Sequence, residues 1–474
     1  VYDSSGKLQI QIEQGLKADV FFSAATKQMD TLVDEKYINK KDVVDLLENK
    51  LVLITGKQTT TEVKDFANIA KAETIAIGNP VRLGKNMLCT GQEALLIALF
   101  ATGFIGLSPV LSLRLAFLEI LCIIAWFRDR NTPIFSIPLG LFVVFLLWIV
   151  IGLFYTPSKL FGVRMILKYI YPFLVALLAA KVVRDGEVFL QAGLWARKVA
   201  TVGIVLLFIP VVNGFSASIF WYVAAFITGL IPMVIFSFAL ADFTEEKRKN
   251  RIWGVLLILP CLLAVFRTDI FGTAVALCTF FFVKYRLKSL PIIAAIGVLG
   301  LCVMFYVPSV KNKMFKNPDE VTMTDFLTRN IKEDDIETNM RKFMWEDAAS
   351  SFYDGHEWIG SGTGRVQTFF YTEATDARRG GQLHNDFLVL LCDNGLIGLS
   401  LFVATYLAIL LHCMSLYRKA RSPYTRMCAL VAGASLIGVC VTMYSDNTLA
   451  YSMVTLSYPW GFYGMALGLK EKLG

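Results

Sequence analysis

The sequence predicts an all-α polytopic membrane protein with a small α/β piece at its N-terminus and a polar insert outside the membrane. Of the 474 residues 55% are hydrophobic, and the mean hydropathy is +0.57. These values exceed those of an ordinary soluble protein. The apolar residues are also unevenly distributed, because 88–307 and 386–470 are mostly apolar runs whereas 1–86 and 308–383 are rich in charge.

The alternation of apolar and polar stretches predicts four segments. We expect a soluble α/β piece over 1–86, membrane helices 1–9 over 87–307, an outer insert with a catalytic segment over 308–393, and membrane helices 10–12 over 394–474. The boundary after Asn86 is abrupt. The chain opens VYDSSGKLQI, without the basic and then apolar start of a secretory signal peptide, so we expect none in this sequence.

The N-terminal piece alternates predicted strands and helices. ADVFFSA (18–24) and LVLIT (51–55) have the short apolar pattern of buried strands, and 27–38 and 40–49 have the periodicity of amphipathic helices. Its sequence resembles the periplasmic molybdate-binding protein of ABC importers in four stretches: SSGKLQIQIEQGLKADVFFSA, QMDTLVDEKYI, ENKLVLITGK and IAIGNP. The resemblance places Ser4 or Ser5 at an anion-binding serine. The match covers only the middle of that family's first lobe, and half a cleft cannot enclose an oxyanion, so we predict no molybdate binding and expect a vestigial or artificial fusion.

About twelve apolar stretches approach the roughly 20 residues that a helix needs to cross a bilayer. They lie near 91–108, 109–127, 134–154, 161–183, 199–213, 217–241, 252–266, 270–284, 290–307, 394–414, 426–444 and 450–469. Alternate loops between them carry the basic residues, which the positive-inside rule assigns to the cytoplasm. Both termini are then expected inside, and 308–383 outside.

Four basic residues break this pattern because they lie near the outer ends of predicted helices: Arg114, Arg164, Lys168 and Arg267. Charge inside a membrane is costly unless it is paired or solvated. Guanidinium groups match phosphate oxygens well, so the set predicts an anion site, with a lipid-linked pyrophosphate as its ligand. The alternative is that each cation extends to lipid headgroups or pairs with Glu119, Asp269 or Asp446.

The outer segment holds three further features. The stretch 339–353 predicts an amphipathic helix with Arg341 and Trp345 four residues apart. GSGTG follows, and its glycines, including Gly362 and Gly364, permit a tight turn that cradles a phosphate or a sugar, or is simply a turn. The segment from His384 to Asn394 then lacks basic residues, so His384 is expected at the water edge of a membrane helix, where a neutral imidazole accepts a proton from a hydroxyl group.

Composition argues against several other classes. The basic residues lie in short clusters between apolar runs, which favours a lipid bilayer over nucleic acid as the partner. The nine cysteines form no CxxC pair, so neither a zinc site nor a disulfide framework is expected. We expect no cofactor and no metal.

Four stretches together resemble the O-antigen ligase and polymerase (Wzy_C-type) family over roughly 90–470. They are FRTDIFGT (266–273), in which Phe266 replaces the family's usual serine, RKFMWEDA (341–348), IGSGTG (359–364) and HNDFLVLLCDNGLIGL (384–399).

This resemblance implies a GT-C-like, metal-independent glycosyltransferase of the bacterial inner membrane with its site facing the periplasm. The donor would be a glycan on undecaprenyl pyrophosphate. His384 would be the catalytic base, Arg267 and Arg341 would hold the pyrophosphate, and Asn385 lies beside the base. Arg164 and Lys168 join the pyrophosphate site from the membrane argument alone.

The acceptor stays open between lipid A-core, a growing glycan and another hydroxyl, as on a protein. The first two correspond to a ligase and a polymerase, in lipopolysaccharide or other cell-envelope biosynthesis. Two alternatives of other kinds also remain: a membrane transporter for an anionic substrate, and a non-functional fusion product.

Overall fold

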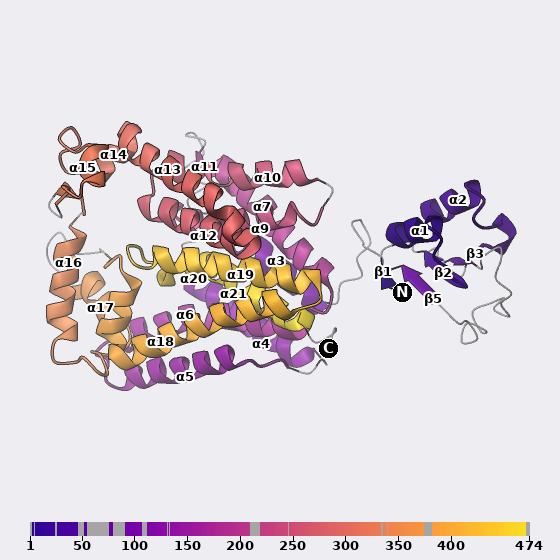
Figure 1. Ribbon diagram of the computed structural model, residues 1–474. Helices are drawn as coiled ribbons and strands as arrows, with labels where there is room; N and C mark the ends of the chain where they lie inside the picture. Colours follow the sequence, from indigo (N-terminus) through magenta and orange to yellow (C-terminus); the bar gives the residue numbers. More distant parts are fainter. Residues whose placement is uncertain are drawn as a thin grey trace. The chain divides into compact units, whose positions relative to one another are not determined.

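The computed structural model describes two compact units, Val1–Leu88 and Cys89–Gly474, and each is treated by itself (Figure 1). The described residues are 2–3, 5–23, 26–45, 52–54, 75–78, 91–106, 111–129, 131, 133–208, 219–244, 246–332, 335–338, 340–373 and 382–470.

The first unit contains a five-stranded sheet of order β1-β5-β2-β4-β3. The strands are β1 (Tyr2–Asp3), β2 (Val20–Ser23), β3 (Val44–Asp45), β4 (Val52–Ile54) and β5 (Ile75–Gly78). β5 pairs parallel with β1 and β2, and β4 pairs antiparallel with β2 and β3. Helices α1 (Ser5–Glu13) and α2 (Thr26–Asp34) contribute Leu8, Met29 and Leu32 to a core around Phe21.

These elements agree with the strands predicted at 18–24 and 51–55 and with the first predicted helix. Of the two serines at the predicted anion position, Ser5 begins α1 and Ser4 lies outside the described residues. The helix predicted over 40–49 is wrong in its described part. Lys40–Asp42 form a 3-10 turn, and Val44–Asp45 pair with β4. Pairing at the sheet edge outweighs a helical pattern here, because β-branched valines suit a strand.

The second unit is a helical bundle. Its helices within or beside the apolar runs are α3 (Gly91–Thr102), α4 (Leu111–Arg128), α5 (Ile137–Ile151), α6 (Lys159–Val182), α7 (Gly186–Phe208), α9 (Val223–Leu240), α10 (Lys247–Leu256), α11 (Leu259–Leu263), α12 (Arg267–Tyr285), α13 (Leu290–Tyr306), α18 (Asp386–Lys419), α19 (Pro423–Thr442), α20 (Ser452–Thr455) and α21 (Ser457–Lys470). The polar segment forms α14 (Pro308–Met314), α15 (Met323–Leu327), α16 (Arg341–Ala348) and α17 (Arg365–Thr368).

Seven stretches of the described chain are long and apolar enough to cross a membrane. They are Ile137–Phe154, Lys159–Val182, Gly186–Leu207, Val223–Leu240, Arg267–Tyr306, Asp386–Lys419 and Pro423–Thr442. The expected all-α membrane class is confirmed, whereas the count of twelve spans stays a prediction. The ends of two predicted spans fall within 209–218, outside the described residues.

One predicted span takes a different form. Residues 252–266 lie in α10 and α11, which are separated by a turn at Leu257–Ile258. Ten and five residues reach roughly 15 and 8 Å at 1.5 Å per residue, well short of the ~30 Å hydrocarbon core. Pro260 is the second residue of α11, and it lacks the amide that would continue the helical hydrogen bonds.

Small residues allow the helices at the centre of the bundle to approach closely. A Cβ added to Gly464 of α21 would lie 2.2 Å from the Ala176 carbonyl oxygen of α6. Between α12 and α19, a Cβ on Gly272 would lie 2.8 Å from the Gly438 carbonyl oxygen. Such contacts drive helix association where water supplies no hydrophobic force.

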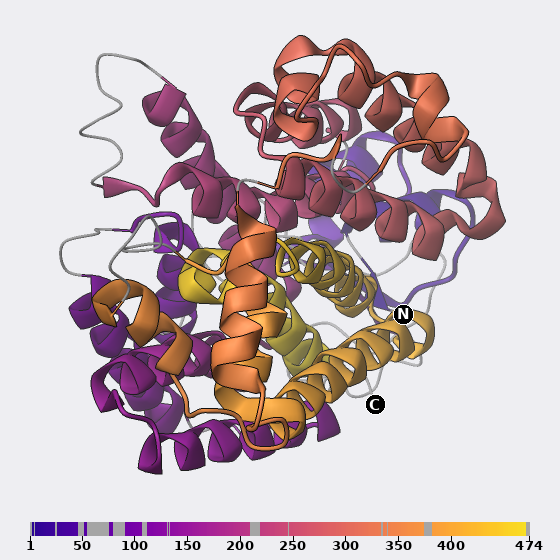
Figure 2. The same cartoon turned by 90° about the vertical axis from the view of Figure 1, so that its left-hand side faces the viewer.

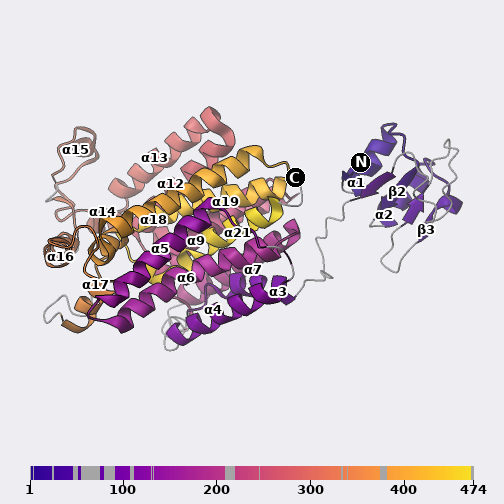
Figure 3. The ribbon, with the colours of Figure 1, turned by 90° about the horizontal axis from the view of Figure 1, so that it is seen from below.

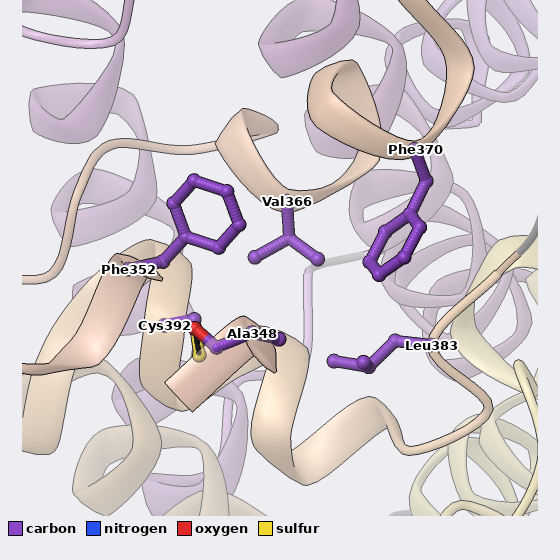
Figure 4. Close-up of a cluster of buried hydrophobic side chains, with 6 residues drawn as sticks. All are labelled: Ala348, Phe352, Val366, Phe370, Leu383 and Cys392. Carbon is purple, nitrogen blue, oxygen red and sulfur yellow. Dashed lines mark hydrogen bonds between the residues drawn. The ribbon is translucent and has the colours of Figure 1, made fainter. Parts of the chain in front are cut away.

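The four short helices of the polar segment gather at one end of the bundle, as Figures 1 and 3 both show. Viewed from that end, α16 lies in front of the bundle (Figure 2). An apolar cluster attaches it there (Figure 4). This cluster comprises Ala348, Phe352, Val366, Phe370, Leu383 and Cys392. It joins α16, the π-helical turn Ala349–Tyr353 and α17 to the start of α18.

α18 is interrupted at Gly395, which has φ 66° and ψ −172°. The amides freed by this break are satisfied by another segment: Leu396 N donates to the Glu357 carbonyl oxygen at 2.7 Å, and Ile397 N donates to that of Trp358 at 3.2 Å. An unsatisfied amide costs several kcal/mol in a membrane, so this pairing is what makes the break tolerable.

We expect Gly395→Ala to destabilise the protein by at least about 3 kcal/mol, because its Cβ would lie 2.2 Å from the Trp358 carbonyl oxygen. Gly355→Ala is the matched control, since Gly355 also has positive φ (82°) but open space around it, and should cost only about 1 kcal/mol. Thermal unfolding in detergent measures both. Equal unfolding midpoints would contradict the close approach at Gly395.

Candidate active site around His384

His384 immediately precedes α18. The side chain of Asn385 caps the helix by accepting a hydrogen bond from Leu388 N at 3.0 Å. His384 itself has φ 53°, in the left-handed region that few non-glycine residues adopt. Its amide donates to Asn447 Oδ1 at 3.0 Å, which helps to hold this conformation. Strained residues of this kind occur preferentially at functional sites.

The imidazole ring contacts two side chains through one nitrogen. His384 Nδ1 lies 2.8 Å from Asn447 Nδ2 and 3.4 Å from Asp446 Oδ1. The His384 side chain is 32% exposed and that of Asp446 15%, so the site is open to water on one side. The sequence predicted Asp446 only as an ion partner and did not indicate Asn447. The signal was the outer loop SDNT (445–448), which is polar between two apolar runs.

A buried carboxylate fixes this loop against the start of α18. Asp386 is 4% exposed, and its Oδ2 accepts a hydrogen bond from Leu449 N at 2.9 Å. Its own amide donates to the Met443 carbonyl oxygen at 2.8 Å. The loop from 443 to 449 is therefore held at both ends, with Asp446 and Asn447 facing His384 between them.

The helix α16 brings Arg341 and Trp345 to the same place. Trp345 Nε1 donates to the Leu383 carbonyl oxygen at 2.7 Å, and its ring packs edge-on against Tyr444 with centroids 5.6 Å apart. Burial lowers the pKa of the Arg341 guanidinium from its ordinary value, and the nearby Asp446 carboxylate and Tyr222 hydroxyl act in the opposite direction. Among the described residues, the Arg341 guanidinium has no hydrogen-bond partner.

Arg267 lies near Arg341 but is engaged with the backbone. Its Nη1 donates to the carbonyl oxygens of Lys313, at 2.6 Å, and Glu337, at 2.8 Å. It therefore connects the start of α12 to two parts of the outer segment. The Arg341 guanidinium is one of the charges that act on it.

Arg164 and Lys168 line a separate cavity of about 250 Å³. Most of its other walls are apolar or aromatic, and Ser112, Gln367 and Ser452 add polar groups. The apolar and aromatic residues include Leu111, Leu115, Phe161, Leu167, Trp221, Tyr371 and Met453. Neither Arg267 nor Arg341 is among its lining residues. Gln367, Tyr371 and Ala450 are shared with a smaller neighbouring cavity that reaches Asp386 and Asn447. The predicted pyrophosphate residues thus form two groups near His384.

Arg114 belongs to neither group. Its guanidinium donates to the carbonyl oxygens of Thr102 at 2.7 Å, Gly106 at 3.3 Å and Ile105. These carbonyls lie at and just beyond the C-terminus of α3, where the last turn leaves carbonyl groups unpaired. Arg114 therefore stabilises the end of α3.

The GSGTG turn packs against protein on its inner side. Gly360, Gly362 and Gly364 all have positive φ, and a Cβ on any of them would lie within 2.6 Å of backbone atoms of other segments. The buried Asp393 carboxylate accepts hydrogen bonds from Gly364 N at 2.8 Å and Val366 N at 2.9 Å. These two amides already bind an anion of the protein itself, which favours the plain-turn interpretation. Asp393 was not predicted from the sequence as a site residue.

Comparisons with known proteins find a separate match for a part of each unit. Residues 252–403 match the O-antigen ligase family. This range contains Arg267, Arg341 and His384. Residues 1–93 match the family of bacterial extracellular solute-binding proteins. Both resemblances drawn from the sequence are confirmed over these residues, and the long apolar helices identify a multi-pass membrane protein.

Two curated relatives match a short part of the chain. One, in Bacillus subtilis (strain 168), carries the name of an ABC transporter substrate-binding lipoprotein, YvgL, and is 48% identical over 79 residues. The other is the molybdate-binding protein ModA of Escherichia coli (strain K12), which is 39% identical over 82 residues. Each alignment covers 17% of this chain, and the chain spans 30% and 31% of the relatives' own lengths.

We expect Asp393→Asn to destabilise the protein by about 2 kcal/mol, because a carboxamide cannot accept from both Gly364 N and Val366 N as a carboxylate does. Asp354→Asn, at an exposed position nearby, is the matched control and should change stability by less than about 0.5 kcal/mol. Thermal unfolding in detergent compares the two. An Asp393→Asn protein as stable as the control would show that the carboxylate does not fix the turn.

Proposed function

We propose that this chain is a bacterial membrane glycosyltransferase of the O-antigen ligase or polymerase type. It transfers a glycan from undecaprenyl pyrophosphate to a hydroxyl acceptor, at the periplasmic face of the inner membrane. The observation that carries the proposal is that the O-antigen ligase match contains His384 and Arg341, which converge on one site with Asp446. A membrane protein of this family has a glycan-processing function.

The reaction places two demands on the protein. The leaving pyrophosphate gains negative charge, and fixed cations in a water-poor site stabilise that charge. The attacking hydroxyl must lose its proton, and a positioned neutral imidazole contributes typically ~10²–10⁴-fold by accepting it. His384 Nε2 is the proposed acceptor, because Nδ1 faces Asp446 and Asn447. These residues supply the chemistry without a metal ion.

The basic side chains differ in how available they are to bind the phosphate groups of the donor. Arg341, Arg164 and Lys168 have guanidinium or ammonium groups without a hydrogen-bond partner among the described residues, so they are available to phosphate oxygens. The cavity that contains Arg164 and Lys168 also has apolar walls, which suit the adjoining isoprenoid chain of a lipid-linked donor. Arg267 supports the site by positioning the outer segment.

The N-terminal unit enters no step of this proposal. The chain spans less than a third of the length of the solute-binding relatives. The acceptor stays open between lipid A-core, a growing glycan and a protein hydroxyl.

The test is complementation with the full chain in a host that lacks its own surface-glycan ligase or polymerase. We expect wild type to restore the glycan ladder on a gel and His384→Ala to abolish it. His412→Ala is the matched control, because His412 lies further along α18 and contacts Tyr463 instead. A ladder from His384→Ala would exclude His384 as base. A correctly inserted wild type that changes neither the ladder nor the lipid-linked donor pool would contradict the proposed function.

A second test addresses the cavity with Arg164 and Lys168. We expect Lys168→Met to raise the donor concentration needed for half-maximal transfer by roughly tenfold, as expected when about 1.5 kcal/mol of charge-assisted binding is lost. Lys159→Met, at the exposed first residue of α6, is the control. Transfer in membrane vesicles is measured against lipid-linked donor concentration. Equal half-maximal donor concentrations for the two variants would show that this cavity does not bind the donor.

A further inference from the structure

The Nδ1 atom of His384 faces two groups of opposite hydrogen-bonding character. Asn447 Nδ2 lies 2.8 Å away and can only donate. Asp446 Oδ1 lies 3.4 Å away, and as a carboxylate oxygen it can only accept. A ring nitrogen either carries a proton or has a lone pair, so it satisfies one of these neighbours at a time.

The orientation of the Asn447 amide is fixed independently. Its Oδ1 accepts the His384 backbone N–H at 3.0 Å. A flipped amide would bring its NH2 group against that N–H, with two donors facing each other. Nδ2 must therefore face the ring. A donor at 2.8 Å requires a lone pair on Nδ1, so the neutral ring of this arrangement carries its proton on Nε2.

This tautomer cannot perform the proposed proton transfer. Nδ1 has the lone pair but is covered by Asn447, and Nε2 already has a proton. When Nδ1–H instead donates to Asp446, Nε2 acquires the lone pair that a hydroxyl group needs. At 3.4 Å this contact is longer than a good hydrogen bond, so the ring must turn away from Asn447 to make it.

We propose that Asn447 and Asp446 compete for Nδ1 of His384: Asn447 holds the resting tautomer, and Asp446 is the positioning residue of the catalytic one. This inference rests on the proposed function. In the reaction, the acceptor oxygen bonds to the anomeric carbon, and the bond from that carbon to pyrophosphate breaks with its electron pair on the leaving oxygen. The hydroxyl proton moves to Nε2, and Asp446 stabilises the imidazolium through Nδ1–H.

The surrounding contacts permit this exchange without refolding. Asp446 and Asn447 are adjacent in a loop that Asp386 and the Met443 carbonyl hold against α18. The backbone N–H of Asn447 donates a hydrogen bond to Asp446 Oδ1 at 2.8 Å and keeps that oxygen in place. The ring therefore moves between two fixed partners. Its 32% exposure gives water access for the proton to change nitrogens.

The functional test is a rescue in the same complementation host, using the full chain. We expect Asp446→Asn to lower transfer by roughly 10²-fold or more, since an orienting carboxylate is lost. Asn447→Asp keeps the acceptor for the His384 amide and replaces the competing donor with a carboxylate. It should be active alone, and the double variant Asp446→Asn/Asn447→Asp should regain at least about tenfold over Asp446→Asn.

Asp446→Asn/Asn447→Ala is the matched control, because it offers no carboxylate and should show no rescue. An inactive Asn447→Asp protein, or a double variant no better than Asp446→Asn, would overturn the inference. With wild type active and His384→Ala inactive, the proposed function would still stand.

A spectroscopic test does not depend on the substrate. The chain has three histidines, so labelling with [15N]histidine in detergent gives few signals, and His384→Gln identifies those of His384. Nitrogen chemical shifts separate a protonated ring nitrogen from one with a lone pair. We expect Nε2–H in the wild type and Nδ1–H in Asn447→Asp. Nδ1–H in the wild type would overturn the role of Asn447.

Discussion

The architecture of the site depends on one constraint, which is that the break in α18 must have its backbone groups satisfied inside a membrane protein. The carbonyls of Glu357 and Trp358 meet the amides after the break, and the Asp393 carboxylate binds the glycine turn beside it. Because of these contacts, the outer segment has a single register on α18. That register places α16 next to the start of α18, where His384 lies.

The site then combines rigid and adjustable parts. Hydrogen bonds to Asp386, Trp345 and the cap Asn385 fix the backbone on both sides of His384. The imidazole ring can hydrogen-bond to either of two neighbours on one loop, Asp446 or Asn447. A base needs this combination, because a proton acceptor must be oriented within tenths of an ångström and still change its protonation state in every cycle.

The sequence was sufficient for features that depend on composition and periodicity. Apolar runs predicted the membrane class, and the short strands at 18–24 and 51–55 followed from their pattern. The break between α10 and α11 depends on Pro260, and the strand at Val44 depends on a partner strand. Hydrophobic periodicity detects neither of these causes. Asn447 was missed for a related reason: 63 residues separate it from His384, and only the tertiary fold brings them together.

Arg267 lies in a stretch that resembles the O-antigen ligase family, and mutagenesis there is easily misinterpreted. Its side chain joins the first turn of α12 to Lys313 and Glu337, which lie on two stretches of the outer segment that pair with each other through Phe315 and Ile336. Removing the guanidinium eliminates the hydrogen bonds to Lys313 and Glu337 as well as a positive charge. A loss of turnover at this position would therefore combine a displaced domain with weakened electrostatics, and Arg341 gives the cleaner measure of charge alone.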